Sequence, residues 1–207
     1  MRKKSTFLDD KMNLILVGES NVGKTSLLNQ YSKGHFSTQV IATVGKTEYY
    51  IILGLEYFTK EEVINDKKVK IKLWDTAGQE QYKSLTKNFY RNASGVIVVF
   101  DVANRKSFEC VEEWTQNIKD YGPKEIIIAL VGNKIDLDRD VSIEEATKLS
   151  KTLKIKYFEC SAKENIGFQS CVVYVSSEIC KSKIKTEVTS SFLENAKKEK
   201  EKNDCNC

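Results

Sequence analysis

Residues 12–25 read MNLILVGESNVGKT and join a short apolar run to a loop that matches the pattern G-x-x-x-x-G-K-[ST]. The apolar half predicts a buried strand, and a helical pattern follows the loop. Gly18 and Gly23 let the backbone wrap a phosphate chain, and the N–H groups that open the helix point at the anion. Lys24 would reach the β- and γ-phosphates, and the Thr25 hydroxyl would ligate Mg²⁺. The alternative, an accidental glycine turn, fits poorly between a strand and a helix.

Apolar patterns in the rest of the chain predict strands that alternate with helices. Residues 69–73 alternate with a period of two, as in a strand with one buried face. The runs at 96–100 and 126–131 are continuously apolar, as in a parallel sheet covered on both faces. The predicted strands are 12–17, 69–73, 96–100, 126–131 and 157–160, and the predicted helices are about 24–33, 104–120, 142–154 and 164–180. This alternation predicts an α/β sandwich with a mostly parallel sheet.

Length and composition favour one globular domain followed by a polar tail. Of the 207 residues, 41% are hydrophobic and 30% are charged, and the net charge is +4. We expect the domain at 8–180 and a flexible tail at 181–207, where seven lysines and five acidic residues replace the apolar pattern. No basic run carries interleaved aromatic residues, which argues against nucleic-acid binding. Without a signal-peptide pattern, we expect the four cysteines that precede the tail to be reduced thiols.

Residues 75–80, DTAGQE, follow the alternating strand. At the end of that strand the Asp75 carboxylate suits a Mg²⁺ partner, and the Gly78 N–H could meet a γ-phosphate. The Gln79 amide could hold an attacking water in line with the phosphate. Taken alone, the segment has a polar turn as its alternative.

Two short motifs after later strands point to a guanine base. Asp136, in the sequence NKID, can accept hydrogen bonds from the N1–H and 2-amino groups of guanine, which adenine does not offer. Asn133 can hold the base edge, the Lys134 stem can cover the ring, and backbone N–H groups of the SAK sequence at 161–163 could meet guanine O6. Each string is weak alone, and a solvated loop is the alternative. All four motifs, however, fall at the carboxyl ends of predicted strands, where open α/β sheets bind ligands.

Together these motifs resemble the Ras superfamily of small GTPases, and the Rab branch within it, over nearly all of residues 12–180. Stretches KLWD (72–75), YKSLT (82–86), FYRNA (89–93) and VVFDV (98–102) are similar to Rab sequences. The resemblance implies a three-layer sandwich with a six-stranded sheet, and GTP hydrolysis that is slow without an activating partner. It implies a switch threonine at Thr43, which ligates Mg²⁺ and senses the γ-phosphate, and an aromatic residue at Phe36 that packs on guanine.

The resemblance also assigns residues to the site. The implied nucleotide-binding residues are Gly18, Ser20, Asn21, Val22, Gly23, Lys24, Thr25, Ser26, Phe36, Thr43, Gly78, Asn133, Lys134, Asp136, Ser161, Ala162 and Lys163. The implied Mg²⁺ ligands are Thr25, Thr43 and Asp75, and the implied catalytic residue is Gln79.

The cysteines in Cys205-Asn206-Cys207 resemble the Rab signal for double prenylation. Two lipid chains anchor stably where one is marginal; the alternative is two spare cysteines on a disordered end. The resemblance implies a lipid-anchored protein on the cytoplasmic face of intracellular membranes, with a cytosolic pool and a role in vesicle-mediated traffic. The implied partners are an exchange factor, a GTPase-activating protein, a prenylation escort, a dissociation inhibitor and effector proteins.

Residues 46–54, KTEYYIILG, depart from the family pattern, because removing them joins Thr-Val-Gly directly to a Rab-like LEYF. We hypothesise a translated short intron: Gly45-Lys46 can be encoded as GGTAAA, with a GTAA donor, and Leu53-Gly54 as TTAGGN, with a TAG acceptor. A genuine loop insertion is the alternative, and sequencing the transcript decides between them.

The segment 46–54 leaves open a second function, a non-hydrolysing nucleotide-dependent membrane adaptor or an inactive splice form. A P-loop kinase is a third option, which NKID disfavours.

Overall fold

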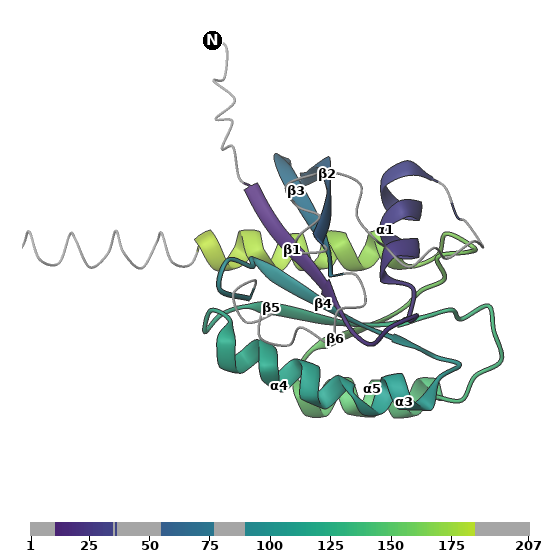
Figure 1. Ribbon diagram of the computed structural model, residues 1–207. Helices are drawn as coiled ribbons and strands as arrows, with labels where there is room; N and C mark the ends of the chain where they lie inside the picture. Colours follow the sequence, from purple (N-terminus) through teal and green to yellow (C-terminus); the bar gives the residue numbers. More distant parts are fainter. Residues whose placement is uncertain (1–10, 35, 37–54, 77–89, 185–207) are drawn as a thin grey trace, which may run out of the picture.

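A six-stranded sheet forms the centre of the computed structural model, which describes residues 11–34, 36, 55–76 and 90–184 (Figure 1). The strands, in the spatial order β2-β3-β1-β4-β5-β6, are β1 (Lys11–Val17), β2 (Leu55–Ile64), β3 (Lys67–Thr76), β4 (Gly95–Asp101), β5 (Ile127–Asn133) and β6 (Lys156–Glu159). β2 pairs antiparallel with β3, and the other pairs are parallel. The predicted fold, a mostly parallel six-stranded α/β sandwich, is confirmed.

Helices cover both faces of the sheet, so the sheet separates two apolar cores. The helices are α1 (Lys24–Lys33), α3 (Arg105–Glu109), α4 (Val111–Tyr121), α5 (Ile143–Leu153) and a C-terminal helix over residues 168–184. α1 and the C-terminal helix pack on one face, and α3, α4 and α5 lie on the other (Figure 1). Every residue of β4 is buried, which explains its continuous apolar sequence.

The turn between β2 and β3 is a two-residue hairpin. Asn65 and Asp66 have φ values of 50° and 62°, the left-handed conformation that a type I′ turn requires and that these two residue types tolerate. The Asn65 side-chain amide donates to the Ser177 hydroxyl oxygen at 3.2 Å. The hairpin therefore rests against the C-terminal helix, far from it in sequence.

Two helices differ from the sequence prediction. The predicted helix at 104–120 is divided at Cys110, whose ψ of −9° departs from helical geometry and interrupts the ladder between α3 and α4. The last helix begins at 168, not 164, because Ser161 and Ile166 form a bridge around a turn. Gly167 then has a φ of +80°, and a Cβ there would lie 2.0 Å from the Glu159 carbonyl oxygen. Only glycine fits this position.

The expected free cysteines are present in the scaffold, and α5 begins with a side-chain cap. Ser142 and Glu145 form a capping box at the start of α5, as their three-residue spacing favours. The cysteines at 110, 160, 171 and 180 are free thiols. Within the described ranges, no helix combines the length and the apolar character needed to cross a bilayer.

Candidate functional site

The loop between β1 and α1 is held by two glycines that no other residue could replace without movement. A Cβ on Gly18, which has a φ of +137°, would lie 2.0 Å from the Val99 carbonyl oxygen of β4. A Cβ on Gly23, with a φ of +94°, would lie 2.4 Å from the side-chain nitrogen of Asn133. The loop therefore packs directly on the ends of β4 and β5, which fixes the first turn of α1.

Lys24 places a cation within this loop. Its ammonium group donates to the carbonyl oxygens of Gly18 at 2.6 Å and Glu19 at 2.7 Å, and the residue is only 5% exposed. The loop is also held from outside, because the Trp114 indole N–H of α4 donates to the Glu19 carboxylate at 3.1 Å. A buried ammonium beside the N-terminus of α1 creates a positive site that suits an anion.

Thr25 and Asp75 meet at the neighbouring strand end. The Thr25 hydroxyl donates to a carboxylate oxygen of Asp75 at 2.5 Å, and Asp75 is 0% exposed. The end of β3 is fixed by Thr76, whose hydroxyl donates to the Leu16 carbonyl oxygen of β1 at 2.6 Å. A hydroxyl and a carboxylate oxygen side by side are hard oxygen ligands, so this pair fits the Mg²⁺ that the sequence predicted.

Asn133, the last residue of β5, bridges two loops. Its side-chain N–H donates to the Val22 carbonyl oxygen at 2.8 Å, and its side-chain oxygen accepts from the Ala162 backbone N–H at 3.2 Å. The residue is 1% exposed. The buried Asn133 amide thus joins the loop between β1 and α1 to the SAK segment. Its N–H group binds the loop and its oxygen binds the SAK segment.

Asp136 is oriented by the SAK segment. One of its carboxylate oxygens accepts from the Ser161 hydroxyl at 2.5 Å, and the other lies 3.7 Å from the Lys163 ammonium. The Ser161 hydroxyl oxygen also accepts from the Glu164 N–H, which fixes its direction. These contacts hold the carboxylate in one orientation, as the recognition of a planar base edge requires.

Comparison with known proteins identifies the family. The Ras family sequence profile matches residues 13–181. The chain belongs to the Ras family of small GTPases. Over 174 residues, 83% of this chain and 75% of each relative, it is 38% identical to rat GTP-binding protein Rab-3D and 37% identical to Ras-related protein Rab-3 of Caenorhabditis elegans. Human Ras-related protein Rab-3A is 36% identical over the same shares. The chain is therefore a Rab-branch small GTPase, and that prediction is confirmed.

Two residues at the site of this Rab-branch chain were missed by the sequence reasoning. Asp101, at the end of β4, forms an ion pair of 2.6 Å with Lys134, whose φ is +67°. Asp101 carried a readable signal, because it is polar and follows an apolar strand in the same way as Asp75. Trp114 carried none, because its contact with Glu19 spans 95 positions.

The remaining predicted residues fall into two groups. Ser20 and Asn21 are exposed on the loop, Ser26 is half-buried in α1, and Phe36 is half-buried against the core beneath α1. Thr43, Gly78, Gln79, Cys205 and Cys207 lie outside the described residues, as does the segment 46–54.

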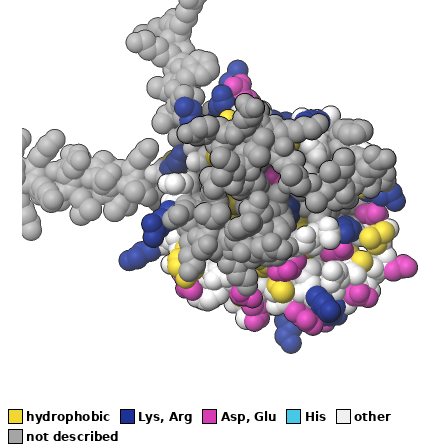
Figure 2. All heavy atoms as spheres, viewed as in Figure 1, with side chains coloured by type: hydrophobic (Ala, Val, Ile, Leu, Met, Phe, Trp, Pro, Cys, Tyr) yellow, Lys and Arg dark blue, Asp and Glu magenta, His cyan; other side chains and the backbone are white. Residues whose placement is uncertain are grey.

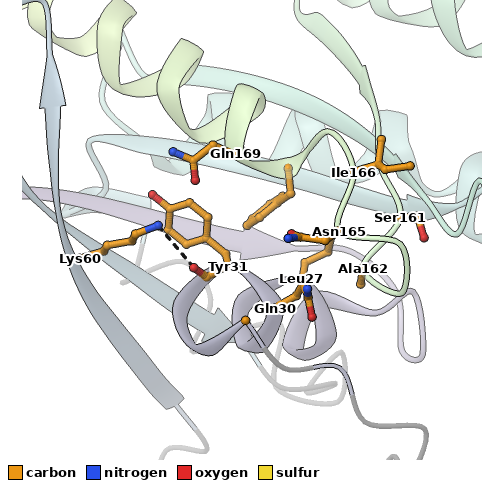
Figure 3. Close-up of a pocket in the computed structure, with 11 residues that line it drawn as sticks. Leu27, Gln30, Tyr31, Lys60, Ser161, Ala162, Asn165, Ile166 and Gln169 are labelled. Carbon is orange, nitrogen blue, oxygen red and sulfur yellow. Dashed lines mark hydrogen bonds between the residues drawn. The ribbon is translucent and has the colours of Figure 1, made fainter.

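A cavity of about 370 Å³ lies between α1, β2 and residues 161–169 (Figure 3). Ser161 and Ala162 form part of its wall, but α1 and β2 supply Tyr31 and Lys60. The Lys60 ammonium lies 4.0 Å from the centre of the Tyr31 ring. Most of this wall is outside the predicted motifs, so the cavity adjoins the SAK segment without being the phosphate site.

Proposed function

We propose that this chain is a GTP-binding and GTP-hydrolysing switch of the Rab type that regulates vesicle-mediated membrane traffic. The observation that carries the proposal is the pair of hydrogen bonds from the Asn133 side chain, which connect the loop between β1 and α1 to the SAK segment. A single ligand with phosphates at one end and a base at the other would touch both. The relatives that carry Rab names support the same function.

In this proposal the loop 18–23 and the N-terminus of α1 bind the phosphates through backbone N–H groups. The Lys24 ammonium exchanges its hydrogen bonds to the Gly18 and Glu19 carbonyl oxygens for hydrogen bonds to the β- and γ-phosphate oxygens. The new bonds are stronger because both partners are charged. Thr25, Asp75 and Thr43 hold Mg²⁺, which neutralises phosphate charge when bound. The other proposed phosphate-loop contacts are made by Ser20, Asn21, Val22 and Ser26.

In this proposal the NKID and SAK segments select guanine. Asp136 accepts the N1–H and 2-amino protons, and the hydrogen bond from Ser161 together with the ion pair to Lys163 orients its oxygens. Phe36 and the Lys134 stem cover the two faces of the ring, and the backbone N–H of the SAK segment contacts O6. Adenine, with the opposite donor pattern, would leave the carboxylate unsatisfied, which is costly in a protected site.

Hydrolysis is assigned to Gln79, which orients the attacking water, while Lys24 and the loop stabilise the charge that develops on the phosphates. Thr43 and Gly78 bind the γ-phosphate, and its release would free both segments for recognition by partners. Ras-family GTPases act with exchange factors, activating proteins and effectors in general. We extend the proposal to a prenylation escort, a dissociation inhibitor, and lipid attachment at Cys205 and Cys207.

The test is single-turnover release of phosphate from GTP by the purified 207-residue chain with Mg²⁺. We expect slow hydrolysis, and we expect Gln79→Leu to lower the rate about tenfold or more, since losing 1.4 kcal/mol of transition-state stabilisation costs a factor of ten. An unchanged rate would contradict the role of Gln79.

The second candidate, a non-hydrolysing adaptor or inactive splice form caused by residues 46–54, is not favoured by the comparisons. A chain without these nine residues is the matched reference. If only that shorter chain released phosphate while both bound GTP, the adaptor would become the better description of the full chain.

A further inference from the structure

The domain has two ends of different chemistry. The candidate site lies where the parallel strands finish, and the opposite end lies where they begin. Each helix that follows a parallel strand runs back, so helix C-termini also gather at this opposite end. The C-terminal helix reaches the same end, and Ile184 is its last described residue (Figure 1).

Hydrogen bonds bring three separate segments together there. Asn65 of the hairpin binds Ser177 of the C-terminal helix at 3.2 Å. Ser182, near the end of that helix, donates to the Glu125 carboxylate at 3.3 Å, which brings in the loop before β5. The hairpin, the loop and the helix therefore form one surface. Together with the start of β1, which pairs with β3 beside the hairpin, we call it the basic end, after its lysines: Lys11, Lys67, Lys68, Lys124, Lys181 and Lys183.

Among the residues that the structure describes on this surface, acidic residues are fewer than lysines, and two of them are engaged. Glu178 pairs with Lys181 at 2.7 Å, and Glu125 accepts the bond from Ser182. Asp66 lies in the hairpin turn. Figure 2 shows Lys and Arg side chains gathered around this end of the domain, at the left of the view. The excess of positive charge faces solvent.

Two apolar side chains are exposed among these lysines. Val63, beside the hairpin turn, is 64% exposed, and Ile184 is 47% exposed. Exposed apolar groups surrounded by lysines suit a lipid surface, where the apolar group enters the interface and the ammonium groups meet headgroups. An acidic protein partner would form ion pairs with the lysines. It would bury the two widely spaced aliphatic side chains less well than a lipid surface would.

The sequence that follows the C-terminal helix does not supply this charge. Residues 185–204 contain five lysines and five acidic residues, so the sequence between the domain and Cys205 is neutral. A polybasic segment beside a lipid anchor is the usual source of attraction to an anionic membrane. In this chain the positive charge near the tail lies on the folded domain.

We propose that the basic end binds the anionic headgroups of a membrane and holds the candidate site away from the bilayer, toward partners in solution. The inference rests on the proposed lipid attachment at Cys205 and Cys207, which would bring the domain to a membrane. Each lysine near an anionic surface contributes roughly a fivefold increase in partitioning.

The test is flotation of the unlipidated, GDP-loaded 207-residue chain with vesicles of phosphatidylcholine alone or with about one-third phosphatidylserine, at low salt. We expect binding to the anionic vesicles only, and loss of binding at high salt. The variant Lys67→Glu/Lys68→Glu should lower partitioning by about 25-fold or more. Both lysines are exposed, so retained GDP binding will show that the variant is folded.

Two controls carry the same charge change elsewhere. Lys106→Glu/Lys148→Glu alters exposed lysines on α3 and α5, and Lys197→Glu/Lys198→Glu alters the tail. Both should bind within about threefold of the parent chain. No preference for anionic vesicles, or an equal loss in either control, would overturn the proposal. The protein is unlipidated, so failure of prenylation or of GTP hydrolysis would leave this result unaffected.

Discussion

Replacing Asn133 by aspartate separates the two hydrogen bonds that this side chain makes. The Ala162 N–H at 3.2 Å still finds an oxygen, because aspartate keeps the shape and the acceptor. The Val22 carbonyl oxygen, which received an N–H at 2.8 Å, now faces a second carboxylate oxygen. Asn133→Asp therefore converts one attractive contact into a repulsive one with almost no change in volume.

The magnitude follows from burial. Asn133 is 1% exposed and Val22 is 0% exposed, so bulk water does not reach the Val22 carbonyl to replace the lost donor. A buried polar group left without its partner costs about 1–3 kcal/mol, and a buried negative charge adds to that. We expect the free energy of unfolding to fall by about 3 kcal/mol. For a chain of this size, that lowers the melting temperature by about 6–12 °C.

The assay is thermal unfolding followed by circular dichroism at fixed saturating GDP and Mg²⁺, with the GDP affinity of each variant measured separately, because bound ligand raises stability. Asn104→Asp is the matched control. Asn104 caps α3 by accepting from the Ser107 N–H at 3.4 Å, and aspartate caps as well as asparagine does. The control should melt within about 2 °C of the parent chain.

A pH series sharpens the test of Asn133→Asp. The protonated carboxyl can donate to the Val22 carbonyl, and burial disfavours its charged form, so the folded-state pKa of this carboxyl is raised above its unfolded value. The penalty is then complete above the folded pKa and shrinks as the pH falls through it. A variant as stable as the control at pH 7, or a penalty independent of pH between 8 and 5, would refute the bridging role of Asn133.

Three further predictions concern the described residues. Arg105 of α3 donates to the Glu145 carboxylate at 2.8 Å, and this hydrogen bond lowers the pKa of Glu145 to about 2. The melting temperatures of the parent and Glu145→Gln should therefore differ by a constant amount above pH 5 and converge as the pH falls toward 2. Trp114→Phe removes the bond to Glu19 and should weaken GDP binding roughly threefold, measured by competition with a fluorescent analogue; unchanged affinity would show that the bond does not position the loop. Burial raises the pKa of Cys160 to about 12 and that of Cys171 well above its ordinary value, so mass spectrometry should find both thiols unalkylated at pH 8 until the protein is unfolded.

Local sequence patterns were sufficient for most of the fold. The predicted helix at about 24–33 matches α1, and the apolar run 126–131 lies within one residue of β5 at its start. These elements were readable because burial imposes a period on neighbouring residues. The division at Cys110 was not readable, because nothing in the composition there breaks a helix, and ψ at one residue is set by packing.

The candidate site was only partly open to sequence reasoning. Position after a strand was enough to select Asp75 and Asn133, and the structure brings Asp75 to Thr25 and Asn133 to Val22. Trp114 was missed because its partner is distant in sequence.

The sequence alone determined five of the six strands, most of the helices and the motifs that stand at their ends, because those properties depend largely on near neighbours. Only the tertiary structure decided that the Asn133 amide joins residues 22 and 162, and that hairpin, loop and C-terminal helix assemble their lysines at one end. Such contacts depend on strand order and register, which bring together atoms that no local pattern relates.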